Sequence, residues 1–156
     1  VLDSSDSISE KSPIRLDLNA ADSLALVKIR GVGPTTASRL LKYRELLGGY
    51  HSVSQLREVY GIDSARYQEI SSYFEVDSTA LRRLNLNEDS FKTLLRHPYL
   101  NYDLVQNIIN FRKEVRSFKN SGELRNIELV NDVLFRKIAP YLSVNTDGED
   151  GNKVSN

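Results

Sequence analysis

The chain has 156 residues, 40% of them hydrophobic, and its 21 Lys and Arg residues are balanced by 21 Asp and Glu residues. Zero net charge argues against a protein that coats a polyanion over its whole surface, but it is compatible with a local phosphate site. The sequence has no cysteine, which excludes disulfides and thiolate metal sites. No apolar run approaches the roughly 20 residues that cross a bilayer. The length suffices for one compact domain or two small ones.

Both ends of the sequence are polar. Residues 1–15 are rich in Ser and Asp and predict a disordered linker, and residues 145–156, mainly Asp, Gly, Asn and Ser, predict a disordered tail. Because the chain begins with Val rather than Met, we expect it to be a fragment. Any signal or anchor before Val1 therefore lies outside the sequence.

Apolar residues at helical spacing predict two helices that meet at a short corner. Asn19 is predicted to cap the first helix, which runs to about Ile29. The second helix is predicted to run from about Pro34 to Leu47, where a glycine pair ends it. These boundaries place Arg30 and the segment Gly-Val-Gly between the helices.

The Gly31-Val32-Gly33 segment has the composition of a backbone anion site. Gly31 suits a left-handed helix end, Gly33 lets a ligand approach the backbone, and Val32 is expected to point inward. The amides that open the next helix have no intrahelical acceptors and carry partial positive charge. The alternative is a tight interhelical turn that serves packing alone.

Further capping signals continue the helical pattern. Ser52 with Gln55 forms a capping box that predicts a short helix to about Val59. A second corner, Gly61-Ile62-Asp63, ends in a carboxylate that suits the cap of a helix over 64–73 and would repel a phosphate there.

The chain contains an internal repeat. A shift of 68 residues aligns 16–76 with 84–144 without a gap, and the apolar stripe of the long helix and two aromatic positions, Tyr43 with Phe111 and Tyr50 with Phe118, match. The sequence therefore predicts an all-α fold of two tandem units, residues 16–76 and 84–144, joined by a short linker at 77–83 and packed together. The second unit replaces the first corner by Tyr99-Leu100-Asn101-Tyr102, and its other corner, 128–131, has no glycine either.

From Leu18 to Arg44 the sequence reads LNAADSLALVKIRGVGPTTASRLLKYR. This stretch resembles the helix-hairpin-helix module of ComEA-type DNA receptors, although Arg30 stands where that family usually has Pro and Thr36 where it often has Lys. The resemblance implies sequence-independent binding of double-stranded DNA and a periplasmic or extracytoplasmic place, with a cytoplasmic place as the alternative. Membrane attachment would need a segment absent from this chain.

The predicted phosphate site combines the corner with nearby cations. Backbone amides of Gly31, Gly33 and Thr35 form the clamp, and a solvated helix face explains Arg39 and Lys42 equally well. The complete predicted site comprises Lys28, Arg30, Gly31, Val32, Gly33, Thr35, Thr36, Arg39 and Lys42. Arg44 and Arg112, which recur in both units, are interpreted as structural residues that pack their stems and donate hydrogen bonds to helix-end carbonyls.

The alternative function is a protein-interaction scaffold that has largely lost DNA binding, since three of four corners lack the glycine pattern. Tyr99, Leu100 and Tyr102 are then the candidate protein contact. His51 and His97 are interpreted as loop residues. No nucleophile and base pair is visible, so we expect no catalysis, no cofactor, no metal site and no small-molecule substrate.

Overall fold

The computed structural model describes residues 15–144. The described residues divide into two compact units, 15–45 with 49–80 (unit 1) and 46–48 with 81–144 (unit 2). The linker predicted over 1–15 lies outside the described residues except for Arg15, and the tail predicted over 145–156 lies wholly outside them.

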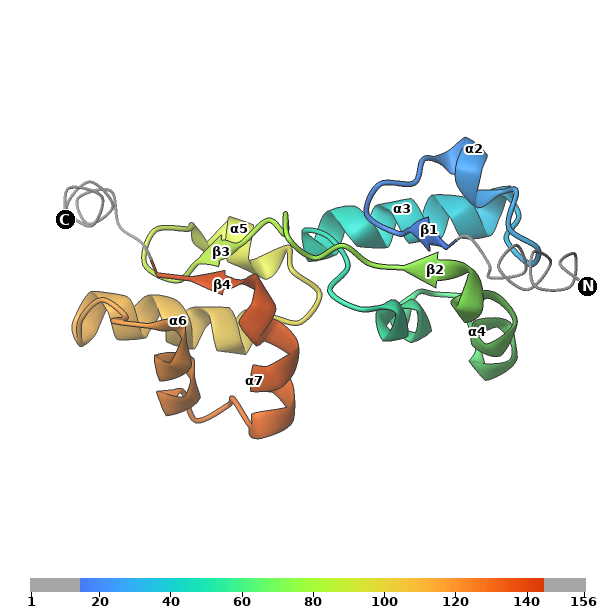
Figure 1. Ribbon diagram of the computed structural model, residues 1–156. Helices are drawn as coiled ribbons and strands as arrows, with labels where there is room; N and C mark the ends of the chain where they lie inside the picture. The colour runs from blue at the N-terminus through green and yellow to red at the C-terminus, as the bar shows by residue number, and fades with distance from the viewer. Residues whose placement is uncertain (1–14, 145–156) are drawn as a thin grey trace, which may run out of the picture. The chain divides into compact units, whose positions relative to one another are not determined.

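Each unit repeats the same order of elements, and the predicted all-α class is confirmed (Figure 1). Unit 1 contains β1 (Leu16–Asp17), α2 (Ser23–Leu26), α3 (Pro34–Leu47), η1 (Val53–Glu58), α4 (Ser64–Ile70), η2 (Ser71–Tyr73) and β2 (Phe74–Glu75). The last two residues of α3 are grouped with unit 2. Unit 2 contains β3 (Leu84–Asn85), α5 (Phe91–Leu95), α6 (Tyr102–Glu114), η3 (Ser121–Asn126), α7 (Asp132–Ile138), η4 (Ala139–Tyr141) and β4 (Leu142–Ser143). Here η marks a 3₁₀ segment.

A short parallel strand pair closes each unit, as Figure 1 shows for β1 with β2 and for β3 with β4. Leu16 pairs with Phe74 in the first sheet, and Leu84 pairs with Leu142 in the second. Two residues are too few to show a period of two, so the sequence pattern could not reveal these strands.

Asn19 is not the cap of the first helix, contrary to the prediction. Asp22 holds that position, with its Oδ1 accepting from the Ala25 amide at 2.8 Å, and α2 has only four residues. Asn19 instead donates from Nδ2 to the carbonyls of Tyr50 and Asp77, each at 2.9 Å, and its Oδ1 accepts from the Tyr50 amide at 2.6 Å. One side chain therefore joins three distant backbone groups.

Unit 2 repeats this arrangement with Asn87. Its Nδ2 donates to the carbonyls of Phe118 and Val144, each at 2.9 Å, and its Oδ1 accepts from the Phe118 amide at 2.7 Å. An asparagine at this position thus links the start, middle and end of each unit.

The two repeated arginines have the structural role that the sequence predicted. Arg44 donates from Nη1 to the carbonyls of Leu18 and Ala21 at 3.0 and 2.7 Å, and Arg112 donates to the carbonyl of Leu86 at 2.9 Å. These carbonyls precede the first helix of each unit rather than end a helix.

The predicted end of the long helix and the predicted capping box are both present. α3 ends at Leu47, and Gly48 and Gly49 have φ of 87° and 111°. Ser52 donates from its amide to Gln55 Oε1 at 3.0 Å, although the segment that follows is 3₁₀ rather than α. Within 15–144, the helices fall short of the length and apolarity needed to cross a membrane.

Candidate nucleic-acid interface

Four corners in the described chain share one construction. An aliphatic side chain points inward, and its amide donates to the carbonyl three residues earlier at 2.9 to 3.1 Å. These buried plugs are Val32, Ile62, Leu100 and Val130, each at most 9% exposed. The plug amide is therefore already bonded inside the corner, so Val32 serves as the plug and not as a phosphate donor.

Three of these corners place a capping side chain over the next helix. The Asp63, Asn101 and Asn131 Oδ1 atoms accept from the amide three residues ahead, at 2.8 to 2.9 Å. Each cap satisfies one amide of the first helical turn, which has no intrahelical acceptor. A ligand at these corners would have to displace the cap.

The first corner lacks such a cap. Gly33 holds the N-cap position of α3, because its carbonyl accepts from the Ala37 amide at 2.9 Å. It has no side chain to reach the amide of Thr36, and a Cβ added at Gly33 would meet no atom within 4 Å. Of the corners in the described residues, the first is thus the one that presents an uncapped helix start beside open space.

Gly31 has a different role from Gly33. Its φ is +96°, and a Cβ there would lie 2.9 Å from Ile70 Cγ2 and 3.0 Å from Glu69 Cδ. Its carbonyl accepts from Arg66 Nη1 at 2.9 Å, while Arg66 Nε lies 3.2 Å from Glu69 Oε1. Gly31 is required for the turn and for packing against α4. Arg66 is the anchor that sequence reasoning missed, because its partner lies 35 residues away.

The predicted cations fall into three groups. Lys28 and Arg30 are exposed between α2 and α3, directly before the corner. The guanidinium of Arg39 lies 4.7 Å from the ring centroid of Tyr60, beside Gly61, and so contacts the second corner. Lys42 is exposed two turns into α3, about 12 Å along the axis from Pro34. Of the four predicted cations, Lys28 and Arg30 therefore lie closest along the chain to Gly33 at the uncapped helix start.

The sequence profile of the helix-hairpin-helix motif matches this chain twice, over residues 12–75 and 80–143. Each match spans one predicted unit with both of its corners. The chain belongs to the helix-hairpin-helix family. No solved structure matches significantly.

Curated relatives of this helix-hairpin-helix chain are named "Endonuclease/exonuclease/phosphatase family domain-containing protein 1". The Xenopus laevis protein is 26% identical over 145 residues and the Danio rerio protein 24% over 142, each match covering 80% of this chain and 26% of the relative. The Mus musculus protein is 22% identical over 153 residues, covering 80% of this chain and 27% of the relative. The chain thus spans about a quarter of the length of these relatives.

The aromatic corner predicted in unit 2 is only partly exposed. Leu100 is 5% exposed and is a core plug, which contradicts its predicted place in a protein contact. Tyr99 is half-buried and packs 5.1 Å from the His97 ring, with Lys137 Nζ 4.5 Å from its centroid. Tyr102 remains 61% exposed. Of the three predicted contact residues, only Tyr102 therefore has a mostly exposed side chain.

His97 is a core residue as well as a loop residue, because its side chain is 3% exposed and its Nδ1 accepts from the Tyr99 amide at 3.1 Å. His51, in contrast, is exposed. Within the described chain, no group of three or more His, Asp or Glu side chains is arranged to hold a metal ion.

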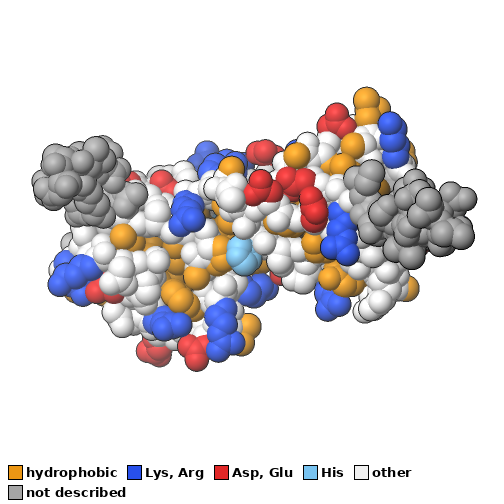
Figure 2. Space-filling model, viewed as in Figure 1, with side chains coloured by type: hydrophobic (Ala, Val, Ile, Leu, Met, Phe, Trp, Pro, Cys, Tyr) orange, Lys and Arg blue, Asp and Glu red, His pale blue; other side chains and the backbone are white. Residues whose placement is uncertain are grey.

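Charges of both signs are interspersed over the surface that Figure 2 presents. An ion pair lies in unit 2, where Arg116 Nη2 is 2.8 Å from Glu123 Oε2. The hydrogen bond from Arg116, together with one from the Lys119 amide, lowers the pKa of Glu123 to about 2. This cation is therefore tied to a carboxylate rather than available to a polyanion.

Proposed function

We propose that the first corner of unit 1 binds the DNA backbone without regard to base sequence. The observation that supports this proposal is the uncapped start of α3 at Gly33, where a side chain would have open space. A phosphate oxygen there would take the place of the capping oxygens that Asp63, Asn101 and Asn131 supply at the other corners.

The donors in this proposal are the amides of Gly33, Thr35 and Thr36, since Pro34 has no N–H. The partial positive charge at the start of the 14-residue helix α3 favours an anion. Lys28 and Arg30 would contact flanking phosphates from the turn before the helix. Phosphate contacts of this kind position a duplex but carry no sequence information.

Three features weaken the clamp. Glu69 lies against Gly31, although Arg66 pairs with its carboxylate. Arg39 is occupied by Tyr60, and Thr36 supplies an amide but no charge. We therefore infer modest affinity, in the range of about 10⁻⁴ to 10⁻⁶ M that is typical of non-specific contacts at physiological salt.

The name of the relatives supports a finer proposal. Their name includes an endonuclease/exonuclease/phosphatase family domain, and this chain matches only about a quarter of their length. We propose that the chain delivers DNA to a hydrolytic domain in proteins of that kind, in preference to the uptake role that the ComEA resemblance suggests. The chain itself supplies binding and not catalysis in this proposal.

A titration with two duplexes of unrelated sequence at about 50 mM salt tests the proposal. We expect the two duplexes to bind with equal affinity and to shift the NMR signals of Lys28, Arg30, Gly33, Thr35 and Thr36. The absence of binding by folded protein would refute it. Binding that depends on base sequence would refute the backbone mechanism. A preference for a single strand of the same length would refute the assignment to double-stranded DNA.

A further inference from the structure

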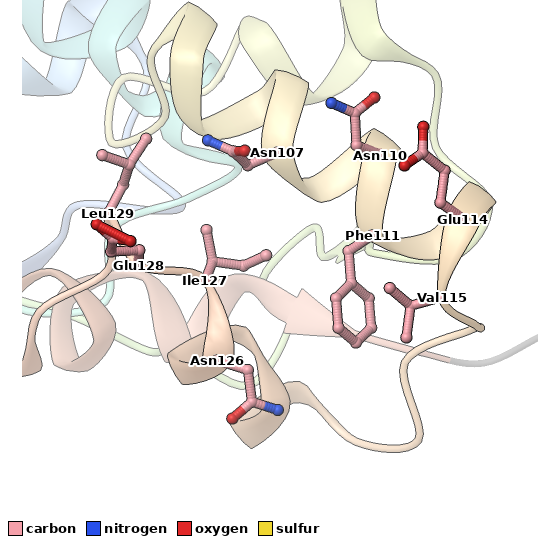
Figure 3. A pocket seen from close by; sticks show the side chains of 9 residues that line it. All are labelled: Asn107, Asn110, Phe111, Glu114, Val115, Asn126, Ile127, Glu128 and Leu129. Carbon is pink, nitrogen blue, oxygen red and sulfur yellow. The ribbon is translucent and has the colours of Figure 1, made fainter.

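Unit 2 contains a pocket of about 420 Å³ between α6 and the segment that joins η3 to α7. Its lining is given in Figure 3 and comprises Asn107, Asn110, Phe111, Glu114, Val115, Asn126, Ile127, Glu128 and Leu129. The side chains of Phe111 and Ile127 extend from the two segments into the space between them. Glu114 and Glu128 lie at opposite ends of the pocket in this view.

The same positions of unit 1 are bridged by side chains. There the guanidinium of Arg39 lies over the ring of Tyr60, and the Tyr43 hydroxyl donates to Glu58 Oε1 at 2.8 Å. The repeat places Asn107, Glu128, Phe111 and Asn126 at these four positions, so neither bridge can form in unit 2. Loss of both bridges leaves the face of α6 open.

The same substitutions reverse the charge of this face. Unit 1 has Arg39, Lys42, Leu46 and Tyr60 at the positions where unit 2 has Asn107, Asn110, Glu114 and Glu128. Two cations are lost and two carboxylates are added at these positions, while the carboxylate of Glu58 is replaced by the carboxamide of Asn126. Within residues 15–144, neither Glu114 nor Glu128 has a cationic partner. A phosphate backbone would be repelled here, because both carboxylates lie within a Debye length of any ligand in the pocket.

The pocket also has an apolar rim. Val115 is 64% exposed and Leu129 is 49% exposed, while Phe111 and Ile127 line the space beneath them. The volume is in the range of sites that hold a small ligand or a few side chains. The carboxylates and carboxamides of the pocket can accept hydrogen bonds from the charged end of a lysine or arginine side chain. The aliphatic groups can contact its methylene stem and apolar residues beside it.

We propose that this pocket is a docking site for a segment of a partner protein that carries an arginine or lysine beside aliphatic residues. The cation lies between Glu114 and Glu128 and donates to the carboxamide oxygens, and the aliphatic neighbours contact Val115 and Leu129. Unit 2 is then a protein-binding unit. This proposal does not depend on DNA binding by unit 1.

The test uses the full chain, labelled for NMR, and two capped tripeptides, one with arginine between two leucines and one with glutamate in its place. We expect the arginine peptide to give saturable shifts at concentrations on the order of millimolar, confined to the side-chain amides of Asn107, Asn110 and Asn126 and to the backbone near them. The glutamate peptide has the same leucines and should give no saturable shift.

Two variants with a matched control locate the site. The double change Glu114→Gln and Glu128→Gln should weaken binding about three- to tenfold, because it removes two exposed ion pairs. Asn107→Arg restores the cation that unit 1 has at this position and should abolish the binding by competition within the chain. Glu88→Gln removes an exposed carboxylate outside the pocket lining and should leave binding unchanged.

Equal responses to the two peptides, or shifts spread over the surface of unit 2, would overturn the proposal. So would unchanged binding in the double variant. Pocket signals that move with duplex DNA and not with the arginine peptide would assign this face to nucleic acid instead.

Discussion

Two glycines separated by one residue have different physical roles at the first corner. Gly31 has a left-handed backbone and no room for a Cβ, whereas Gly33 has neither constraint. The sequence motif treats them alike, but in the structure Gly31 is required for the turn, whereas Gly33 leaves the start of α3 uncapped. Substitutions at the two glycines should therefore have different effects, and each substitution can serve as a control for the other.

Gly33→Asp should abolish DNA binding while the protein stays folded. The new carboxylate would cap the Thr36 amide and place a negative charge where a phosphate would lie, and a cap at this position is worth a few tenths of a kcal/mol over glycine. The melting temperature should therefore stay level or rise slightly. Fluorescence anisotropy with a labelled duplex and thermal unfolding measure the two effects.

Asn101→Asp is the matched change at the equivalent corner of unit 2, where a cap is already present. Its effect on DNA affinity should be small. Equal losses from Gly33→Asp and Asn101→Asp would show that the uncapped corner is not the clamp, and DNA affinity would then have to come from dispersed cations such as Arg82, Arg83, Lys113 and Lys119.

Gly31→Ala should destabilise unit 1 by about 1 to 3 kcal/mol, because alanine is strained at positive φ and its Cβ would collide with Ile70. Chemical denaturation measures the loss. Gly33→Ala, where the added Cβ meets no atom within 4 Å, should change stability by less than about 0.5 kcal/mol. A Gly31→Ala protein as stable as the parent would contradict the positive φ.

At the scale of elements, each unit is closed by side chains that reach across it rather than by long strands. Asn19 and Asn87 donate hydrogen bonds to backbone carbonyls at the middle and end of their units. The strands they adjoin have only two residues each. Because the strands form few backbone hydrogen bonds, the asparagine side chains supply a large share of the hydrogen bonds that join the start of each unit to its end.

Asn19→Ala should therefore cost about 2 to 4 kcal/mol, because three hydrogen bonds are lost and partly buried backbone groups remain without partners. Asp22→Ala removes the true cap of the first helix and should cost about 1 kcal/mol. Denaturant unfolding of the two variants compares them. A larger loss of stability from Asp22→Ala than from Asn19→Ala would contradict the role of Asn19 as the link between distant backbone groups.

The start of η3 should show a pH dependence that comes from Glu123. Its pKa is lowered to about 2 in the folded chain from an ordinary value of 4.5. A lowered folded-state pKa means that the contribution of the ionised carboxylate is fully present above about pH 4.5 and is lost as the pH falls toward 2. Carbon NMR of the Glu123 carboxyl should give a midpoint near 2.

Glu123→Gln provides the control for this titration. The variant cannot form the ion pair with Arg116, so the difference in unfolding midpoint between variant and parent should shrink as the pH is lowered from 5 to 2. A difference that stays constant over this range would contradict the ion pair. A carboxyl midpoint near 4.5 would contradict it as well.

At the scale of the whole molecule, the two copies of the repeat have different surfaces. Unit 1 retains the uncapped corner with Lys28 and Arg30, and unit 2 has capped corners and an acidic pocket. The cores of both units are built from matching positions. The two units therefore differ in the charge and capping of these exposed positions while they share the same order of elements.

The salt dependence of DNA binding should reflect this division. A single clamp with two flanking cations contacts few phosphates, so a plot of log affinity against log salt concentration should have a slope of about −1 to −3. Titrations between 50 and 200 mM salt measure it. A slope much steeper than −4 would show that cations dispersed over the molecule, and not the corner, dominate the binding.

The sequence by itself determined the helical class, the 68-residue repeat, the end of α3 at the glycine pair and the inward plug at Val32. These features depend on local chemistry and on period, which are both readable along the chain. Only the tertiary structure decided the roles of Asn19, Gly31, Leu100 and Arg39. Each of these depends on a partner that folding brings from elsewhere, as when α4 meets Gly31 or the second corner meets Arg39. The sequence of one segment does not show which distant residues will pack against a side chain, and these partners decide the role of that side chain.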